Sequence, residues 1–390
     1  MNASAETKTS GLNAGVTRVV VLSRCAWTMY NFRRHLIRSL VAKGIDTIAA
    51  GAGGDGYEAK VESLGISFVS VPLSARHANP LEELRLFLAF YRLLRKNRPQ
   101  VVHAFTIKPV IFGTLAAGAA RVPVRVVTIT GLGHVFTSSG FALRMLTMGL
   151  YRVALHFAHC VYFQNTVDRD IFLEHKLVSP GKVRMIAGSG VDTEAFLPQV
   201  INKVAPGLTF VMVARVLREK GVCEFFEAAK RVRAIYSEVR IVLVGGVDLR
   251  NPTSLTEEQT RHSADKSGVT WIGQVDDVRP YLAEADVVVL PSYREGTPMS
   301  LLEAAAMAKP IVTTDVPGCT EVVQHGINGY LVKARDSQSL AEGMLECIRH
   351  PERLRDMGMA GRRMVESKFD ANRISSQMLG DYNQIWSSGH

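Results

Sequence analysis

The chain has 390 residues, of which 47% are apolar, so it is long enough for two domains and too apolar for wholesale disorder. Its 46 Lys and Arg against 36 Asp and Glu give a net charge of +10. Such a charge suits nucleic acid, an anionic membrane face or phosphorylated substrates, or is a generic basic surface. Nucleic acid is the weakest of these, because no basic run is interleaved with exposed aromatic residues.

The cysteines and the N-terminal residues indicate the compartment. Five cysteines without a C-x-x-C pair argue against a disulfide framework or a zinc site and for a reducing cytosol. They are Cys25, Cys160, Cys223, Cys319 and Cys347. Residues 1–15 are polar and small, and we expect them to form a flexible tail without the features of a signal peptide. No uncharged run reaches the ~18 residues of a spanning helix, so we expect a cytoplasmic protein.

From Val16, short β-branched runs alternate with helical patterns, which predicts a doubly wound α/β domain over residues 16–200. The expected strands are Val19–Leu22, Thr47–Ala50, Phe68–Val71, Val101–Ala104, Val124–Ile129, Cys160–Gln164 and Val183–Ile186. The expected helices are Arg33–Lys43, Tyr57–Leu64, Glu82–Lys96, Ile111–Ala120 and Leu143–Ala158.

The alternation pauses at residues 196–207, where two prolines and a glycine indicate an interdomain linker, placed at 201–207. It restarts over 208–365, which predicts a second α/β domain and a cleft between the two. The expected strands are Thr209–Ala214, Arg240–Val244, Val269–Ile272, Val287–Leu290, Ile311–Thr314 and Tyr330–Val332. The expected helices are Val222–Ile235, Arg279–Ala283, Leu301–Met307 and Ser339–Arg349. A charged C-terminal helix at 366–390 could cross back to the first domain.

The stretch P-S-Y-R-E-G-T-P-M-S-L-L-E, residues 291–303, joins a buried strand to a helix. Ligands of parallel sheets sit beyond the carboxyl ends of the strands, and a helix N-terminus there favours phosphate. Glu295 lies in the loop, and Glu303 lies near the first helical turns, within reach of a hydroxyl pair. The two glutamates alone would suit a solvated loop and a helix dipole, but the strand and G-T-P favour an anionic, hydroxyl-rich ligand.

A second candidate is V-A-R-V-L-R-E-K-G, residues 213–221. Arg215 and Lys220 follow a strand end, where a guanidinium fork and a compact cation could hold a diphosphate. The alternative is a strand cap followed by an exposed turn.

Two glycine-rich turns carry weaker signals. Gly188-Ser189-Gly190-Val191-Asp192 permits close approach of a ligand to the backbone, or is an ordinary loop. The run G-A-G-G-D-G at 51–56 matches a dinucleotide fingerprint but follows the second strand and lacks the acid about 20 residues on. We interpret it as a flexible loop.

Five motifs in order resemble the retaining GT-B glycosyltransferases that carry E-x7-E: A-R-V-L-R-E-K-G, the G-V-D turn, V-G-G at 244–246, W-I-G at 271–273 and E-G-T-P-M-S-L-L-E. The resemblance implies two facing Rossmann-like domains, a nucleotide-sugar donor held mainly by the second domain, and no metal or other cofactor. It also implies a front-face reaction in which the leaving phosphate helps to deprotonate the acceptor.

The resemblance assigns roles to particular residues. Arg215 and Lys220 hold the diphosphate, Glu295 faces the donor sugar and Glu303 accepts hydrogen bonds from the ribose. Further donor-binding residues are Gly190, Gly245, Gly246, Gly273, Gly296, Thr297, Pro298, Met299 and Ser300.

V-V-H-A-F-T-I-K-P at 101–109 and T-I-T-G-L-G at 128–133 are similar to a bacterial subgroup that extends sugars on undecaprenyl diphosphate. The wider family often has His-Gly in the second loop, where this chain has Thr130-Gly131. His103 ends a strand and is favoured as a structural residue. The acceptor or phosphate side then takes Thr106, Lys108, Thr130, Gly131 and His134.

Two apolar, basic stretches, Leu84–Arg98 and Phe141–Phe157, are each more typical of core-packing helices than of membrane-surface helices. A lipid-linked acceptor favours the membrane interpretation. We therefore predict a retaining hexosyltransferase that moves a hexose or N-acetylhexosamine from a nucleotide sugar to a lipid-linked saccharide in bacterial polysaccharide or glycan assembly. The resemblance implies that the nucleotide sugar is a UDP-sugar. It would lie peripherally on the inner face of an anionic membrane. The alternatives are a nucleotide-sugar epimerase of the GT-B type and a non-catalytic scaffold that binds sugar nucleotide or lipid.

Overall fold

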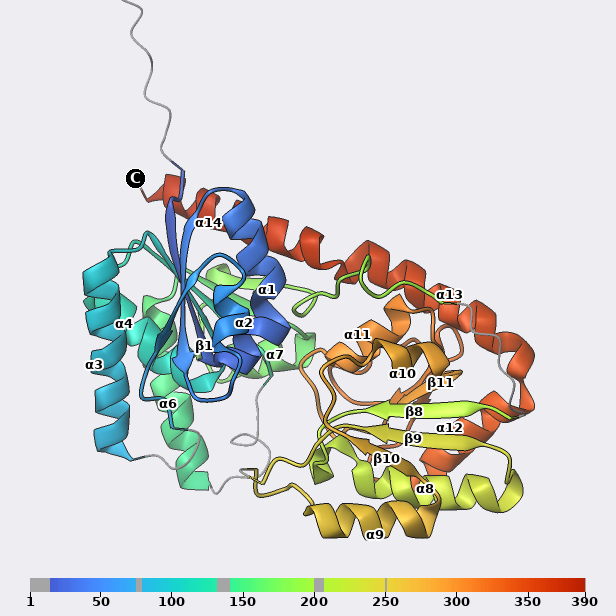
Figure 1. Cartoon of the computed structure of the whole chain (residues 1–390). Coiled ribbons are helices and arrows are strands. Elements are labelled where there is room, and N and C mark those ends of the chain that lie inside the picture. Colours follow the sequence, from blue (N-terminus) through green and yellow to red (C-terminus); the bar gives the residue numbers. More distant parts are fainter. Residues whose placement is uncertain (1–14, 75–78, 132–140, 200–206, 250, 390) are drawn as a thin grey trace, which may run out of the picture.

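The computed structural model describes residues 15–74, 79–131, 141–199, 207–249 and 251–389. Two α/β domains lie beside each other, and helices near the C-terminus run along both of them (Figure 1). Each domain is built on one parallel sheet. The predicted fold class, two facing Rossmann-like domains, is confirmed.

The sheet of the N-terminal domain has seven described strands in the order β3-β2-β1-β4-β5-β6-β7. The strands are β1 (Arg18–Cys25), β2 (Asp46–Ala52), β3 (Ser67–Ser70), β4 (Val101–Phe105), β5 (Val124–Ile129), β6 (Cys160–Phe163) and β7 (Val183–Met185). The central strands are buried on both faces, as their apolar runs require. The strand order reverses between β1 and β4, and a crevice for ligands is expected where the loops after these strands diverge.

Helices cover both faces of this sheet. They are α1 (Ala26–Ala42), α2 (Glu58–Glu62), α3 (Pro80–Asn97), α4 (Thr114–Ala119), α6 (Phe141–Phe157) and α7 (Thr166–Glu174), with short helical turns at η1 (Pro109–Gly113) and η2 (Pro180–Lys182). The helices α3, α4 and α6 pack together on one face, and α1 packs with the C-terminal helix on the other (Figure 1).

The C-terminal domain has a sheet of six described strands in the order β10-β9-β8-β11-β12-β13. The strands are β8 (Thr209–Val213), β9 (Arg240–Val244), β10 (Thr270–Gly273), β11 (Val287–Leu290), β12 (Ile311–Thr314) and β13 (Gly329–Val332). Its helices are α8 (Val222–Ile235), α9 (Glu257–Ser267), α10 (Arg279–Glu284), α11 (Met299–Ala306), α12 (Ser337–Arg349) and α13 (Leu354–Met364), with turns η3 (Arg218–Lys220), η4 (Pro351–Arg353) and η5 (Val365–Phe369). The order reverses between β8 and β11, which lie next to each other.

Some helix positions differ from the expectation. The first helix begins at Ala26 rather than at Arg33, because its first turn is capped from a distant loop: the Trp27 N–H donates to Asp55 Oδ2 at 2.8 Å. The helices α7 and α9 were not predicted. A signal for α9 was present, since Thr256 and Gln259 form a capping box at its start.

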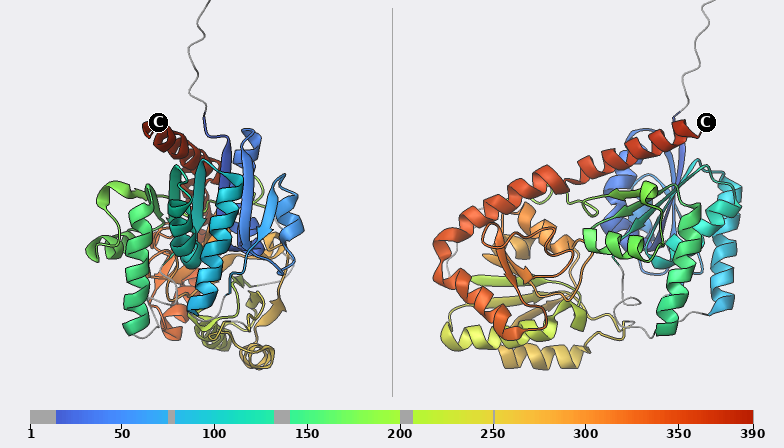
Figure 2. Two further views of the ribbon diagram at one scale, coloured as in Figure 1. Left: turned by 90° about the vertical axis from the view of Figure 1, so that its left-hand side faces the viewer. Right: turned by 180° about the vertical axis from the view of Figure 1, so that it is seen from behind.

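The C-terminal helix α14 (Ala371–Ser388) crosses back to the N-terminal domain (Figures 1 and 2). Its apolar side chains Met378 and Tyr382 enter the core beside the first sheet. The Tyr382 hydroxyl forms a hydrogen bond of 2.5 Å with His103 Nδ1, and His103 Nε2 forms one of 2.7 Å with Thr128 Oγ1. Complete burial lowers the pKa of His103 well below its usual value, so the ring is neutral. His103 is thus a structural residue, as the sequence indicated.

We predict that Tyr382→Phe lowers the free energy of unfolding by about 1–3 kcal/mol, because the ring is kept while a buried His103 nitrogen loses its partner. Denaturant titration of the full chain measures the change. The control is Tyr91→Phe on α3, whose half-buried ring stacks on Phe87. Equal changes in the two variants would refute a stabilising role for the His103–Tyr382 bond.

Candidate active site

The candidate site lies at the carboxyl ends of β8 and β11, where the strand order reverses. Lys220 ends the turn after β8, and Glu295 lies in the loop after β11. The Lys220 Nζ atom lies 2.5 Å from Glu295 Oε1, and Ser292 Oγ donates to the same oxygen at 2.6 Å. The structure therefore brings together the two charged motifs that the sequence singled out.

The backbones of these two loops pack tightly. Gly221 has φ +75°, and a Cβ on it would lie 2.1 Å from the Pro291 carbonyl oxygen. The Tyr293 N–H donates to the Glu219 carbonyl oxygen at 2.9 Å. Any larger residue at 221 would force the loops apart, so the glycine of R-E-K-G places Lys220 beside Glu295.

Arg215 follows β8 at the exposed edge of the site. Its Nη1 lies 3.0 Å from Asp248 Oδ2, and 42% of its side chain is exposed. A guanidinium has five N–H groups, so this single contact leaves donors for a ligand. Arg215 and Lys220 thus bring two cations to the end of the same strand.

Three predicted donor-binding glycines lie at the ends of β9 and β10. Gly245 has φ +150°, and a Cβ there would lie 1.8 Å from the Ala214 carbonyl oxygen. A Cβ on Gly246 would lie 3.0 Å from Gln274 Oε1. Gly273 has φ +85°, and a Cβ there would meet no described atom within 4 Å. Gly245 is therefore required by packing, whereas Gly273 borders open space.

The helix α11 begins directly after the G-T-P of the loop. Pro298 occupies the N-cap position with an extended backbone, and Met299 and Ser300 form the first turn. The Thr297 hydroxyl is buried and has no hydrogen-bond partner among the described residues. The first N–H groups of this helix lack carbonyl partners within it, which suits a phosphate.

Glu303 lies on α11, half-buried. Burial raises the pKa of its carboxyl group to about 7, the charge of Asp277 acts in the same direction, and Arg34 of α1 opposes it. Because Arg34 belongs to the N-terminal domain, both domains contribute to the field at this carboxylate.

The structure places the G-S-G turn at the junction of the two domains. A Cβ on Gly188 would lie 2.8 Å from Thr297 Cβ, and Arg33 Nη1 donates to Ser189 Oγ at 2.7 Å. A Cβ on Gly190 would lie 2.6 Å from Ala371 Cα, at the start of α14. Gly190, which we expected beside the donor, thus packs against the crossover, and it is Gly188 that faces the donor loop.

On the N-terminal side, Thr130 and Gly131 lie against the donor loop. A Cβ on Gly296 would lie 2.3 Å from the Thr130 carbonyl oxygen, and one on Gly131 would lie 3.5 Å from the Gly296 nitrogen. This glycine pair therefore lets the two domains touch directly beside Glu295. His134 lies outside the described residues.

Thr106 and Lys108 follow β4, at the crevice of the first sheet. Thr106 has φ +67°, unusual for a β-branched residue, and its buried Oγ1 has no partner within the described ranges. Lys108 Nζ lies 2.6 Å from Glu83 Oε1 of α3. The strained, unsatisfied Thr106 is consistent with a ligand-facing loop, and Lys108 is held by α3.

Sequence reasoning missed a cluster of buried polar residues in the N-terminal domain. Gln164, Asn165 and Asp168, at the start of α7, lie against Arg294 and Gly296 of the donor loop. The N-cap pattern of Asn165 followed by Asp168 was a signal for the helix but not for this contact.

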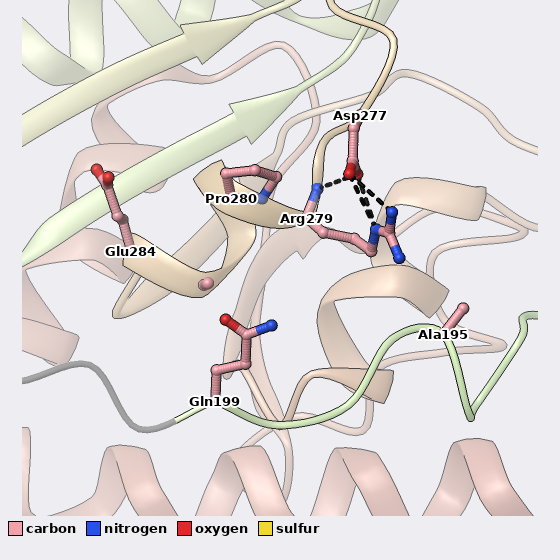
Figure 3. A pocket seen from close by; sticks show the side chains of 7 residues that line it. Ala195, Gln199, Asp277, Arg279, Pro280 and Glu284 are labelled. Atoms are coloured by element: carbon pink, nitrogen blue, oxygen red, sulfur yellow. Dashed lines mark hydrogen bonds and ion pairs between the residues drawn. The ribbon is translucent and has the colours of Figure 1, made fainter.

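Two surface hollows lie near the domain junction. One, of about 390 Å³, lies between α10 and the segment leading to the linker (Figure 3). It is lined by Ala195, Gln199, Asp277, Arg279, Pro280, Ala283 and Glu284, none of which was predicted to bind the donor. The other, of about 350 Å³, lies at the ends of β2 and β3 and includes Gly53 and Arg85.

Within the part of the chain that the structure describes, no group of three His, Cys, Asp or Glu side chains suits a metal ion.

A cation pair and a helix N-terminus at the reversal point of one Rossmann-like sheet suit an enzyme that binds a diphosphate, and two such domains facing each other form the GT-B architecture. Residues 30–188 match the family model described as "Glycosyl transferase 4-like domain", and residues 207–350 match "Glycosyl transferases group 1". The chain belongs to this family of glycosyltransferases and is a hexosyltransferase.

Two curated relatives cover large parts of the chain. An N,N'-diacetylbacillosaminyl-diphospho-undecaprenol alpha-1,3-N-acetylgalactosaminyltransferase of Campylobacter jejuni is 28% identical over 94% of this chain and 99% of its own length. A UDP-Gal:alpha-D-GlcNAc-diphosphoundecaprenol alpha-1,3-galactosyltransferase of Escherichia coli is 26% identical over 70% of this chain and 73% of its own.

Solved structures share the fold. Anabaena HepE in complex with UDP superposes with a TM-score of 0.76 at 17% identity, covering 94% of this chain and all of that one. Sucrose-phosphate synthase from Thermosynechococcus elongatus gives a TM-score of 0.79 at 20% identity, covering 95% of this chain and all of that one.

We predict that Glu303→Ala weakens UDP affinity by about 10- to 100-fold, the loss expected for a charge-assisted hydrogen bond. Because the pKa of Glu303 is raised to about 7, the carboxylate form increases as pH rises through 7, and UDP binding by the parent chain should tighten over the same range. Calorimetric titration at several pH values measures both effects.

The control is Glu258→Ala, at an exposed position on α9, which should leave affinity unchanged. Glu303→Gln should remove the part of the pH dependence that belongs to this carboxyl group. Unchanged UDP affinity in Glu303→Ala would remove the ribose assignment.

Proposed function

We propose that the protein is a retaining glycosyltransferase that moves a hexose or N-acetylhexosamine from a UDP-sugar to a saccharide carried on undecaprenyl diphosphate. The assignment of the donor rests on the Lys220–Glu295 ion pair near the start of α11. Arg215 adds a second cation after the same strand that precedes Lys220. The names of the Campylobacter jejuni and Escherichia coli relatives support the acceptor class. The complex of HepE with UDP supports the choice of nucleotide.

The residues of the site have distinct tasks in this reaction. The bond between the anomeric carbon and the phosphate oxygen breaks, and the acceptor hydroxyl oxygen bonds the same face of that carbon. The hydroxyl proton passes to the leaving phosphate. Lys220 has three N–H groups and uses one on Glu295, so it can bind the diphosphate without releasing the glutamate. With Arg215 it stabilises the charge that develops on the leaving group.

Glu295 is held by Lys220 and Ser292 and orients the sugar hydroxyls. It is not the nucleophile of a double displacement, because the leaving phosphate and the acceptor react on one face of the sugar. No metal is needed in this scheme, since Arg215 and Lys220 supply the positive charge that a metal would otherwise bring to the diphosphate.

The acceptor side belongs to the N-terminal domain. The hollow of about 350 Å³ at the ends of β2 and β3 includes Arg85 from the first turns of α3. Thr106 and Thr130 follow neighbouring strands of the same sheet and lie between this region and the donor loop. A saccharide reaching from the hollow to Glu295 would pass along these strand ends, with its lipid directed toward α3.

The first turns of α3 and α6 form an apolar and basic surface, which we call the docking patch. It comprises Leu81, Leu84 and Arg85 of α3 and Phe141, Leu143, Arg144, Met145 and Leu146 of α6. Phe141 is 81% exposed and Leu81 67% exposed. Both helices project at the same end of the domain (Figures 1 and 2). None of the helices that the structure describes combines the length and apolarity needed to span a bilayer, so we assign this patch to peripheral contact with the inner face of the cell membrane.

The transfer itself is tested by UDP release from a panel of UDP-sugars in the presence of undecaprenyl-diphosphate-linked saccharides. We expect release that depends on the acceptor, a product with the anomeric configuration of the donor, and full activity in EDTA. Glu295→Ala should lower kcat by at least about 100-fold with little change in UDP affinity, because its contacts are to the transferred sugar. Free epimerised sugar nucleotide would favour the epimerase alternative, and UDP binding without any turnover would favour a scaffold.

The membrane contact is tested by sedimentation with liposomes of anionic or neutral lipid. We expect binding to anionic lipid at low salt that is largely lost at 1 M salt, where the Debye length falls to about 3 Å. Each basic residue near such a surface contributes about 1 kcal/mol. Leu84→Glu and Leu146→Glu should weaken binding, whereas Ile235→Glu, at an equally exposed apolar position of the C-terminal domain, should not. Equally weak binding to both lipids at low salt would refute the membrane contact and leave the transfer reaction untouched.

A further inference from the structure

Three polar residues of the N-terminal domain are buried where β6 passes into α7. The exposed fractions of Gln164, Asn165 and Asp168 are 6%, 1% and 1%. Asn165 caps α7: its Oδ1 accepts the Asp168 N–H at 2.8 Å, and its Nδ2 donates to Asp168 Oδ2 at 3.1 Å. These bonds leave the second oxygen of the Asp168 carboxylate for another partner.

That partner comes from the other domain. Arg294 Nη2 forms an ion pair with Asp168 Oδ1. Asn165 Nδ2 also lies 3.4 Å from the Gly296 carbonyl oxygen, and a Cβ on Gly296 would lie 2.8 Å from Gln164 Oε1. Each of the three buried polar residues thus contacts the short segment from Arg294 to Gly296.

The residue between these two contacts is Glu295. Its side chain turns to its own domain, where it meets Lys220 and Ser292, and its N–H donates to the Pro317 carbonyl oxygen at 3.2 Å. The residues before and after it are held from the N-terminal domain. The position of the Glu295 backbone therefore depends on both domains.

We propose that Asp168 and Arg294 are positioning residues that hold Glu295 for sugar transfer only while the two domains are closed on each other. This inference rests on the proposed function, in which Glu295 contacts the transferred sugar. Neither residue needs to touch donor or acceptor. Their pair acts through the backbone of the loop that carries Glu295.

Burial makes the pair sensitive to closure. Asp168 is 1% exposed and the Arg294 side chain is 26% exposed, so Arg294 retains access to water while Asp168 does not. Opening of the domains separates the carboxylate from its guanidinium and removes the Asn165–Gly296 contact in the same movement. A displacement of about 1 Å in a catalytic group can lower turnover by about 100-fold, so loosening this loop should be measurable in kcat.

A purely structural ion pair would behave differently. Its loss would lower the melting temperature and would change donor affinity and turnover only through unfolding. A positioning pair should lower kcat in a folded chain whose UDP affinity is intact, because the diphosphate and ribose residues Arg215, Lys220 and Glu303 stay in place.

The experiment compares Asp168→Asn, Arg294→Met and the double variant in the full chain. Asp168→Asn keeps the size of the side chain and the cap of α7, and Arg294→Met keeps the apolar stem. We expect kcat to fall by about 10- to 100-fold in each single variant. The kcat of the double variant should be no lower than that of the less active single variant, because both substitutions remove the same contact. Arg294→Lys should recover part of the loss, because it restores the charge without the fork.

The matched control is Arg240→Met, which removes a guanidinium from the exposed Arg240–Glu284 pair within the C-terminal domain. It should leave kcat and UDP affinity unchanged. Circular dichroism and the melting temperature verify folding of every variant. A kcat within twofold of the parent in both single variants, or a loss that falls wholly on UDP affinity, would overturn the positioning role.

Small-angle scattering measures domain closure without any turnover, so it tests the Asp168–Arg294 pair even if the proposed function is wrong. If the parent chain releases no UDP from any donor, the proposed function fails, but closure can still be compared. We expect a larger radius of gyration for Asp168→Asn and Arg294→Met than for the parent chain and Arg240→Met. An unchanged radius in both variants would show that the pair does not hold the domains together.

Discussion

The contact between Lys220 and Glu295 depends on two parallel strands that are neighbours in space and far apart in sequence. Because β8 and β11 run in the same direction, the loops that follow them emerge at one edge, and Gly221 allows them to touch. A cation and a carboxylate then share the start of α11. In a site that must hold a diphosphate next to a neutral sugar, this pairing orients the glutamate while the lysine retains N–H groups for phosphate.

The two domains are joined by more than the linker. The chain crosses at the bridge between Val191 and Asp370, and α14 then completes the core of the first sheet through Tyr382 and His103. The core of the N-terminal domain therefore depends on residues from the C-terminal end of the chain. The close contact of Gly190 with Ala371 makes this crossover a fixed point, whereas the Arg294–Asp168 pair lies at the facing edges of the cleft.

The architecture, and the meeting of Lys220 with Glu295, could be predicted because their signals are local. Buried parallel strands are short β-branched runs, and Lys220, Glu295 and Glu303 lie in loops or first turns directly after such runs. The start of α1 could not be predicted, because Asp55 caps it from 28 residues away. The contact of Gly190 with α14 and the cluster of Gln164, Asn165 and Asp168 were not predicted, because both depend on residues that are far away in the sequence. A glycine required by α14 and one required by a ligand have the same appearance in a sequence.

Domain closure links these observations physically. The facing backbones come close at Gly131 and Gly296, and at Gly296 a side chain would collide with the Thr130 carbonyl oxygen. Gly188 lies against the Thr297 side chain. Such close approach limits the access of water to Glu295, whose side chain is 11% exposed, and strengthens the electrostatic interaction of Lys220 with a leaving diphosphate. Two polar contacts between the domains favour closure: Asp168 with Arg294, and Tyr57 with Asp276. Both polar contacts must break when the cleft opens, so the free energy of opening is set by the same surfaces that position the reacting groups.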